Sequence, residues 1–159
     1  MFKIIFNYLA WCKETKTAAN GREVIIDTIC VGYRSEYGLV KLDTSAGAEP
    51  GSFELCELFP TGKNQDCSVT LTADNRFALG KDDQTTFVDL SGTTALESLT
   101  WSGTPKSIAN DPPYLISTLS DFVEIRTETP KMVIQTIDLQ KGYIEFTLRI
   151  FMPQINLAF

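Results

Sequence analysis

The chain has 159 residues, 43% of them apolar and 11% aromatic, which is enough length and apolar content to bury the core of one domain. Its 14 basic and 20 acidic residues give a net charge of −6, which disfavours broad electrostatic binding to nucleic acid or to an anionic membrane surface. It contains no histidine, so the commonest general base, the commonest metal ligand and the central member of most hydrolytic triads are all missing.

The N-terminal stretch FKIIFNYLAWC, residues 2–12, is apolar but too short to span a bilayer. It holds a single lysine, is interrupted by Asn7 and lacks an A-x-A cleavage pattern. We therefore expect a strand or a short helix packed on the domain, rather than a signal peptide, and we expect no transmembrane helix.

Short extended segments follow one another along the rest of the chain, separated by turn-forming residues. The predicted strands are 22–27, 28–33, 37–43, 52–59, 68–73, 76–81, 85–90, 96–101, 114–119, 122–127 and 132–139. No run of residues sustains the spacing of an amphipathic helix with both caps. The predicted fold class is therefore all-β with little helix.

The predicted strands repeat along the chain. Gly32 in ICVGY, Gly80 in FALGK and Thr118 in LISTL fall at equivalent places, 48 and 38 residues apart. A period of this length with about four strands is typical of a β-propeller blade, which buries its faces against neighbouring blades. A two-sheet sandwich is the alternative, and the internal repetition favours the propeller. About three periods are present, so we predict a partial propeller whose two terminal blades leave apolar faces uncovered.

The best delimited repeat is DPPYLISTLSDFVEIRTETPKMVIQTIDLQ, residues 111–140. Pro112 and Pro113 cannot donate to a sheet ladder, so a strand should begin after them. Turns at Ser120-Asp121 and Thr129-Pro130 divide the remainder into an antiparallel meander of three strands.

Several segments resemble the citron-homology (CNH) domain of the Vam-six-like (vacuolar protein sorting thirty-nine) subunits of the HOPS tethering complex. The domain of their CORVET relatives, the transforming-growth-factor-beta-receptor-associated proteins, is similar. The matching segments are ICVGY at 29–33, ELFPTGK at 57–63, PPYLI at 112–116, VEIRT at 123–127 and VIQTIDLQ at 133–140. The resemblance covers roughly residues 25–140. It divides the chain into a divergent N-terminal segment (1–21), a partial CNH propeller (22–145) and a divergent C-terminal tail (146–159).

The resemblance implies a non-enzymatic scaffold in the cytoplasm, peripheral on the late endosome or lysosome membrane. Its implied partners are a Rab-type small GTPase and other tethering-complex subunits, in vesicle transport and in fusion of late endosomes or autophagosomes with lysosomes. Two alternatives stay open. One is a CNH fragment of a kinase or exchange factor that binds a small GTPase, and the other is a small all-β ligand-binding domain, which would need a pocket of convergent polar groups.

The residues that could carry chemistry have simpler structural interpretations. Cys12, Cys30, Cys56 and Cys67 form no CxxC pair and are expected to be free, buried thiols in a reducing compartment. Asp82-Asp83 is expected to be a solvated turn rather than a metal or acid site. Glu54 and Glu57 should lie on opposite faces of a strand, which is unsuitable for glycoside hydrolysis.

Two more candidates concern anions and partners. Gly51-Ser52 and Pro60-Thr61-Gly62-Lys63 lack the P-loop pattern, and we predict a hairpin turn. Trp101 is expected to pack between blades rather than to anchor a partner. A loose basic cluster is offset by neighbouring acids, which predicts a mixed surface; its basic members are Arg126, Lys131 and Lys141 and its acidic ones Glu124, Glu128 and Asp138. We predict no catalytic, cofactor-binding or metal-binding residue.

Overall fold

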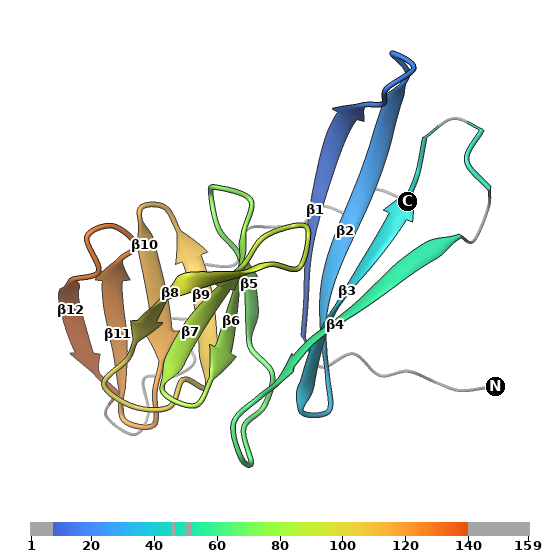
Figure 1. Ribbon diagram of the computed structural model, residues 1–159. Coiled ribbons are helices and arrows are strands. Elements are labelled where there is room, and N and C mark those ends of the chain that lie inside the picture. The colour runs from blue at the N-terminus through green and yellow to red at the C-terminus, as the bar shows by residue number, and fades with distance from the viewer. Residues whose placement is uncertain (1–7, 46, 50–51, 140–159) are drawn as a thin grey trace, which may run out of the picture.

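The computed structural model describes residues 8–45, 47–49 and 52–139, and within these residues the regular structure is entirely β. Twelve strands form three four-stranded antiparallel sheets, and each sheet is a meander with its strands in chain order. The three sheets lie side by side as successive blades of a partial propeller (Figure 1). No helix in this part of the chain is long and apolar enough to cross a membrane. The predicted all-β partial propeller of about three blades is confirmed.

Sheet 1 consists of β1 (Tyr8–Thr17), β2 (Glu23–Tyr33), β3 (Glu36–Asp43) and β4 (Phe53–Pro60). For the N-terminal segment, the strand alternative is the one observed, because β1 pairs with β2 along its whole length. The prediction of two strands, 22–27 and 28–33, was wrong: β2 is continuous. Asp27 and Thr28 do not end it, since both are buried and pair in register with Leu42 and Lys41.

Sheets 2 and 3 repeat this arrangement. Sheet 2 consists of β5 (Val69–Leu71), β6 (Phe77–Lys81), β7 (Gln84–Val88) and β8 (Thr94–Thr100). Sheet 3 consists of β9 (Ser107–Asp111), β10 (Tyr114–Thr118), β11 (Phe122–Thr127) and β12 (Val133–Asp138). The prediction that residues 111–140 supply the last three strands holds, but β9, which completes the blade before the two prolines, was not predicted.

The sequence repeat has a structural meaning. In each sheet the second and third strands form a hairpin, and the equivalent residues occupy the second pair from its turn. Gly32 pairs with Tyr37, Gly80 with Thr85, and Thr118 with Val123. The register of the three hairpins is therefore the same, so residues at equivalent places face equivalent directions.

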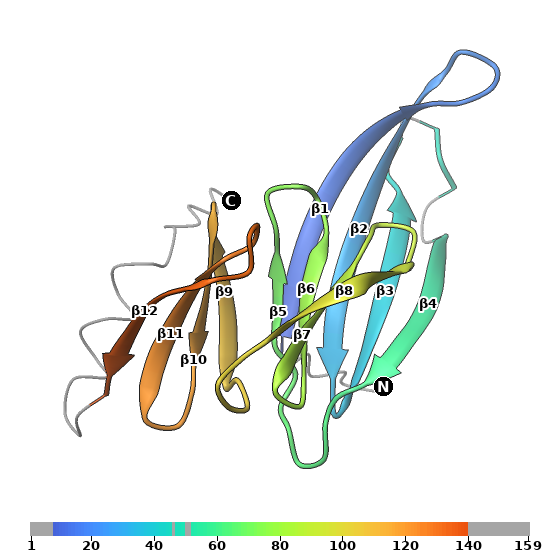
Figure 2. The same ribbon diagram turned by 60° about the vertical axis from the view of Figure 1, so that its left-hand side comes forward.

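Each sheet has two faces, which we name by chain order: the forward face packs on the following sheet and the backward face on the preceding one. A first core between sheets 1 and 2 includes Cys30, Leu39, Phe77 and Leu79. A second core lies between sheets 2 and 3 and is built from Ala78, Phe87, Leu99, Trp101, Ile108, Leu115 and Leu119. The first strand of sheet 2, β5, contacts both β1 and β9, whereas β4, β8 and β12 are the outer edges (Figure 2).

Polar bonds also join neighbouring sheets. The buried Tyr37 hydroxyl donates to the Gly80 carbonyl at 2.6 Å and accepts from the Ser68 amide at 2.9 Å, which ties sheet 1 to sheet 2. The Ser68 hydroxyl in turn accepts from the Ile108 amide at 2.7 Å, at the start of sheet 3. Ser68 thus links all three sheets, and its bonds satisfy buried backbone groups that a purely apolar interface would leave unpaired.

Candidate functional site

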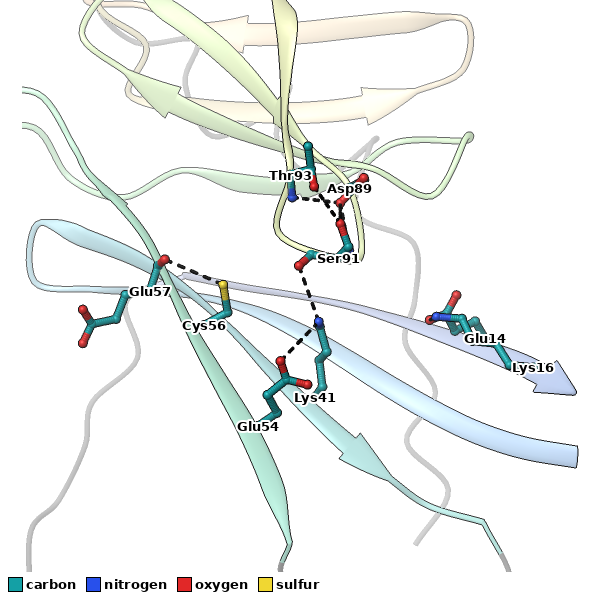
Figure 3. A network of polar contacts seen from close by, with 9 residues as sticks. All are labelled: Glu14, Lys16, Lys41, Glu54, Cys56, Glu57, Asp89, Ser91 and Thr93. Atoms are coloured by element: carbon teal, nitrogen blue, oxygen red, sulfur yellow. Dashed lines mark hydrogen bonds and ion pairs between the residues drawn. The ribbon is translucent and has the colours of Figure 1, made fainter. Parts of the chain in front are cut away.

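A groove with a volume of about 400 Å³ opens where the forward face of sheet 1 meets the turn between β7 and β8. Its lining mixes charged and apolar side chains: Glu14, Lys16, Ile26, Lys41, Asp43, Ser52, Phe53, Glu54, Leu90 and Ser91. Residues from β1, β3 and β4 thus face a turn of the next sheet (Figure 3).

The wall of the groove on sheet 2 is a fixed turn. The Asp89 carboxylate accepts hydrogen bonds from the Ser91 amide at 2.8 Å and the Thr93 amide at 2.9 Å (Figure 3). A bond from the Ser91 hydroxyl, helped by these amides, holds the pKa of Asp89 below its ordinary value. The carboxylate therefore stays ionised and keeps the turn in one conformation.

Charges on the opposite wall alternate in sign. Lys41 donates to the Ser91 carbonyl at 3.5 Å and lies 3.8 Å from Glu54, so it spans the two sheets. Lys16 pairs with Glu14 on β1 at 2.5 Å. The Ser45 hydroxyl and amide bind Asp43 and lower its pKa, so that carboxylate also remains charged.

This arrangement suits recognition of another surface. The apolar lining residues can accept a side chain, and the alternating charges can fix its orientation. Within the described residues, no three histidine, cysteine, aspartate or glutamate side chains are placed to hold a metal ion. No sequence motif indicates this groove, because its lining residues come from two different repeats.

The acidic candidates lie as predicted. Asp82 and Asp83 form the turn between β6 and β7, where Asp82 has a left-handed backbone with φ of 53°. Glu54 pairs with Lys41 and Glu57 with Gly38, which places the two glutamates on opposite faces of sheet 1. The structure does not bring these carboxylates together into one site.

The prediction of a hairpin turn at Pro60-Thr61-Gly62-Lys63 was wrong. Pro60 ends β4, and the next residues begin the connection between sheets 1 and 2. There the Gln65 side chain accepts from the Gly62 amide at 3.1 Å and the Asp82 amide at 2.6 Å, and donates to the Asp82 carbonyl. This connection is held against the β6–β7 turn, so its glycine serves packing rather than phosphate binding. Gly51 lies outside the described residues.

Trp101 packs between blades as predicted and is only 3% exposed. Its indole nitrogen donates to the Thr85 hydroxyl at 2.7 Å. The prediction of a mixed surface was wrong for Glu124, which is 0% exposed and forms an ion pair with Arg126. The Arg126 guanidinium lies 5.8 Å from the Trp101 ring, so this pair belongs to the interface between sheets 2 and 3. Lys131 instead pairs with Glu97 at 3.1 Å, and Lys141 lies outside the described residues.

All four cysteines are free. Cys12, Cys30 and Cys67 are buried as predicted, but Cys56 on the outer strand β4 is half-buried. Burial, with a contribution from the neighbouring Cys67 thiol, raises the pKa of Cys30 to about 12. The buried thiols therefore act as small apolar side chains in the first core.

The backward face of sheet 1 exposes apolar side chains that a closed core would bury. Its exposed apolar side chains are Leu9 at 55%, Trp11 at 52%, Phe53 at 64% and Leu55 at 57%. They lie on β1 and β4, on either side of the half-buried Ile29 and Val40. The sequence predicted uncovered faces on the terminal blades, and the register now identifies which residues form this one.

Comparisons with known proteins agree with this architecture. The family model of the CNH domain matches residues 9–145. The Vam6/Vps39-like protein of Homo sapiens is 34% identical over 134 residues, which cover 84% of this chain but 13% of that protein. Vacuolar sorting protein 39 of Arabidopsis thaliana is 34% identical over 134 residues, covering 83% and 11% respectively.

Among solved structures, the AfRom2 CNH domain superposes with a TM-score of 0.50 at 17% sequence identity. The match covers 84% of this chain and 55% of that chain. At this identity the likeness concerns the fold. The chain therefore spans about half of the matched solved domain and a small part of the relatives' full length.

Proposed function

Because this chain belongs to the CNH domain family, we propose that it is a non-enzymatic docking scaffold of a vacuolar-sorting tethering subunit. The observation that carries this proposal is the sequence identity with Vam6/Vps39-like proteins, which extends over 84% of this chain. A scaffold works by holding a recognition surface rigid, and the two cores with their inter-sheet hydrogen bonds supply that rigidity.

The proposed partners are a Rab-type small GTPase in its GTP-bound form and the other subunits of a HOPS-type tethering complex. The proposed setting is the cytoplasmic surface of late endosomes and lysosomes, where tethering precedes fusion with endosomes or autophagosomes. The chain would attach there through its protein partners.

We further propose that the groove between sheet 1 and the β7–β8 turn contacts the GTPase. Two features support this choice: the groove joins elements from two sheets, and its Asp89-fixed turn needs no ordering before binding. A preformed surface loses less entropy on association than a mobile one. Its alternating charges would select one orientation of the partner.

The test is a binding titration of the purified chain against a late-endosomal Rab loaded with GTP or with GDP. We expect binding to the GTP form and a roughly tenfold loss for Glu54→Lys, which reverses one charge of the groove. Glu97→Lys is the matched control: it is also an exposed glutamate paired with a lysine, but on the outer strand β8.

Two outcomes would contradict different parts of the proposal. Absence of binding, both by this chain and by a full-length relative, would remove the GTPase as partner. Binding that is equally weakened by Glu54→Lys and by Glu97→Lys would remove the groove as the contact surface.

A further inference from the structure

The backward face of sheet 1 carries apolar residues at the positions where sheet 2 packs against its preceding sheet. Through the common register, the Trp11–Ile29 pair of sheet 1 occupies the place of the Leu71–Phe77 pair of sheet 2. Leu71 packs against the first core and Phe77 is fully buried in it, whereas about half of the Trp11 side chain is exposed. Positions that meet a neighbouring sheet elsewhere in the chain meet none among the described residues here.

The buried charge of this face is already paired within sheet 1. The Trp11 indole nitrogen donates to Asp27 at 2.9 Å, and the Thr44 hydroxyl donates to the other Asp27 oxygen at 2.8 Å. Lys13 lies 3.8 Å from the same carboxylate. Because the buried Asp27 carboxylate already has these three partners, covering this part of the face would not leave that charge unpaired.

The forward face of sheet 3 is the complementary half. Ile116, Val123 and Ile125 occupy the places that Cys30, Tyr37 and Leu39 hold in sheet 1. There, those residues pack on the next sheet. A further residue of this face, Ile137 on β12, pairs with Val123 and is 38% exposed. The chain thus ends its described part with the kind of face that packs onto a backward face.

We propose that a second copy of this chain covers both faces. The forward face of sheet 3 in one copy packs on the backward face of sheet 1 in the other, and the reverse contact closes the pair. Both contacts repeat the step seen between sheets 1 and 2 and between sheets 2 and 3. The closed pair would contain six sheets, within the range of roughly four to eight blades that close a propeller.

Size and symmetry favour this occupant. The solved CNH domain extends beyond the matched part by a remainder nearly as large as the three sheets themselves. A second copy therefore has the right size to complete a ring. A head-to-tail contact that closes after two copies forms a twofold-symmetric dimer, whereas a contact that does not close would propagate into a filament.

The test measures the molar mass of the purified full chain by light scattering after size-exclusion chromatography. We expect a dimer, and we expect Trp11→Glu and Ile137→Glu to weaken it roughly 100-fold or more, since each buries a charge in an apolar contact. Leu96→Glu is the matched control, because Leu96 is fully exposed on β8, and it should leave the dimer intact. Circular dichroism confirms that each variant keeps its β structure.

Mixing the two monomeric variants is the decisive step. Trp11→Glu retains an intact sheet 3 face and Ile137→Glu an intact sheet 1 face, so one contact can form and a heterodimer should reappear. A contact of sheet 1 with sheet 1 would not be rescued by mixing. A monomeric unmutated chain, assemblies larger than two, or failure of rescue would each overturn the proposal. None of these outcomes depends on GTPase binding, so the proposed function is tested separately.

Discussion

The Tyr37 hydroxyl offers a sensitive test of how the first two sheets are held together. Tyr37→Phe removes one oxygen atom from a fully packed site and changes no apolar contact. In the unmutated chain this hydroxyl donates to the Gly80 carbonyl at 2.6 Å and accepts from the Ser68 amide at 2.9 Å, both in the buried interface. The substitution therefore leaves a buried donor and a buried acceptor without partners.

The size of the effect follows from these two groups. Each buried group that loses its partner costs about 1–3 kcal/mol, so we expect Tyr37→Phe to lower the free energy of unfolding by about 2–5 kcal/mol. The assay is urea unfolding followed by tryptophan fluorescence. Of the two tryptophans, Trp101 is buried between sheets 2 and 3 and reports the loss of that interface.

A matched control separates the lost hydrogen bonds from the loss of a hydroxyl as such. Tyr114→Phe makes the same chemical change at a tyrosine of sheet 3 that is 38% exposed, and it should shift the unfolding free energy by less than about 0.5 kcal/mol. Equal changes in the free energy of unfolding for the two variants would refute the reasoning, because the hydrogen bonds of Tyr37 between the sheets would then add no stability.

Three further substitutions or conditions test other contacts. Gly32→Ala would place a Cβ 2.3 Å from the Cβ of Cys67 and should lower the free energy of unfolding in urea by about 1–3 kcal/mol. Gly38→Ala is the control: its nearest atom lies at 3.5 Å, so it should leave this free energy almost unchanged. A larger loss for Gly38→Ala than for Gly32→Ala would contradict the packing of the first core. Burial raises the pKa of Cys30 from 9.0 to about 12, so the folded state favours the neutral thiol. The stability that this thiol contributes is complete below pH 9 and is lost as the pH rises toward 12. A melting temperature that does not fall across this range would contradict a buried thiol. Glu124→Gln should lower the unfolding free energy by about 3 kcal/mol, since its arginine partner loses its counter-charge in a buried interface, and an unchanged urea midpoint would mean that the pair is solvated.

The repeat was predictable because it depends on local signals. Turn residues recur at fixed distances from the same hairpin, and Gly32, Gly80 and Thr118 mark one register position in three sheets. The strand β9 was not predictable in this way. Its sequence, SIAND, offers two apolar residues and no clear alternation, and it is a strand because it pairs with β10.

The burial of Glu124 shows a second limit. Strand β11 places Glu124 and Arg126 on one face and Val123 and Ile125 on the other. The predicted mixed surface took the charged residues to face solvent, which is the usual case for a sheet with one side in solvent. In a stack of blades both faces meet neighbours, so the charged pair was buried and the aliphatic face was left half exposed. The sequence of one strand cannot reveal this, because it depends on which face receives a partner.

The polar contacts between sheets also change along the stack. The residue opposite the marked position is Tyr37 in sheet 1, and its hydroxyl bonds sheet 2. In sheet 2 it is Thr85, whose hydroxyl accepts the Trp101 indole from the connection to sheet 3. In sheet 3 it is Val123, which can make no such bond. A contact on the forward face of sheet 3 must therefore form by apolar packing at this position. The backward face of sheet 1 matches that requirement, because the indole nitrogen of its exposed Trp11 is already bonded to Asp27 within the same sheet.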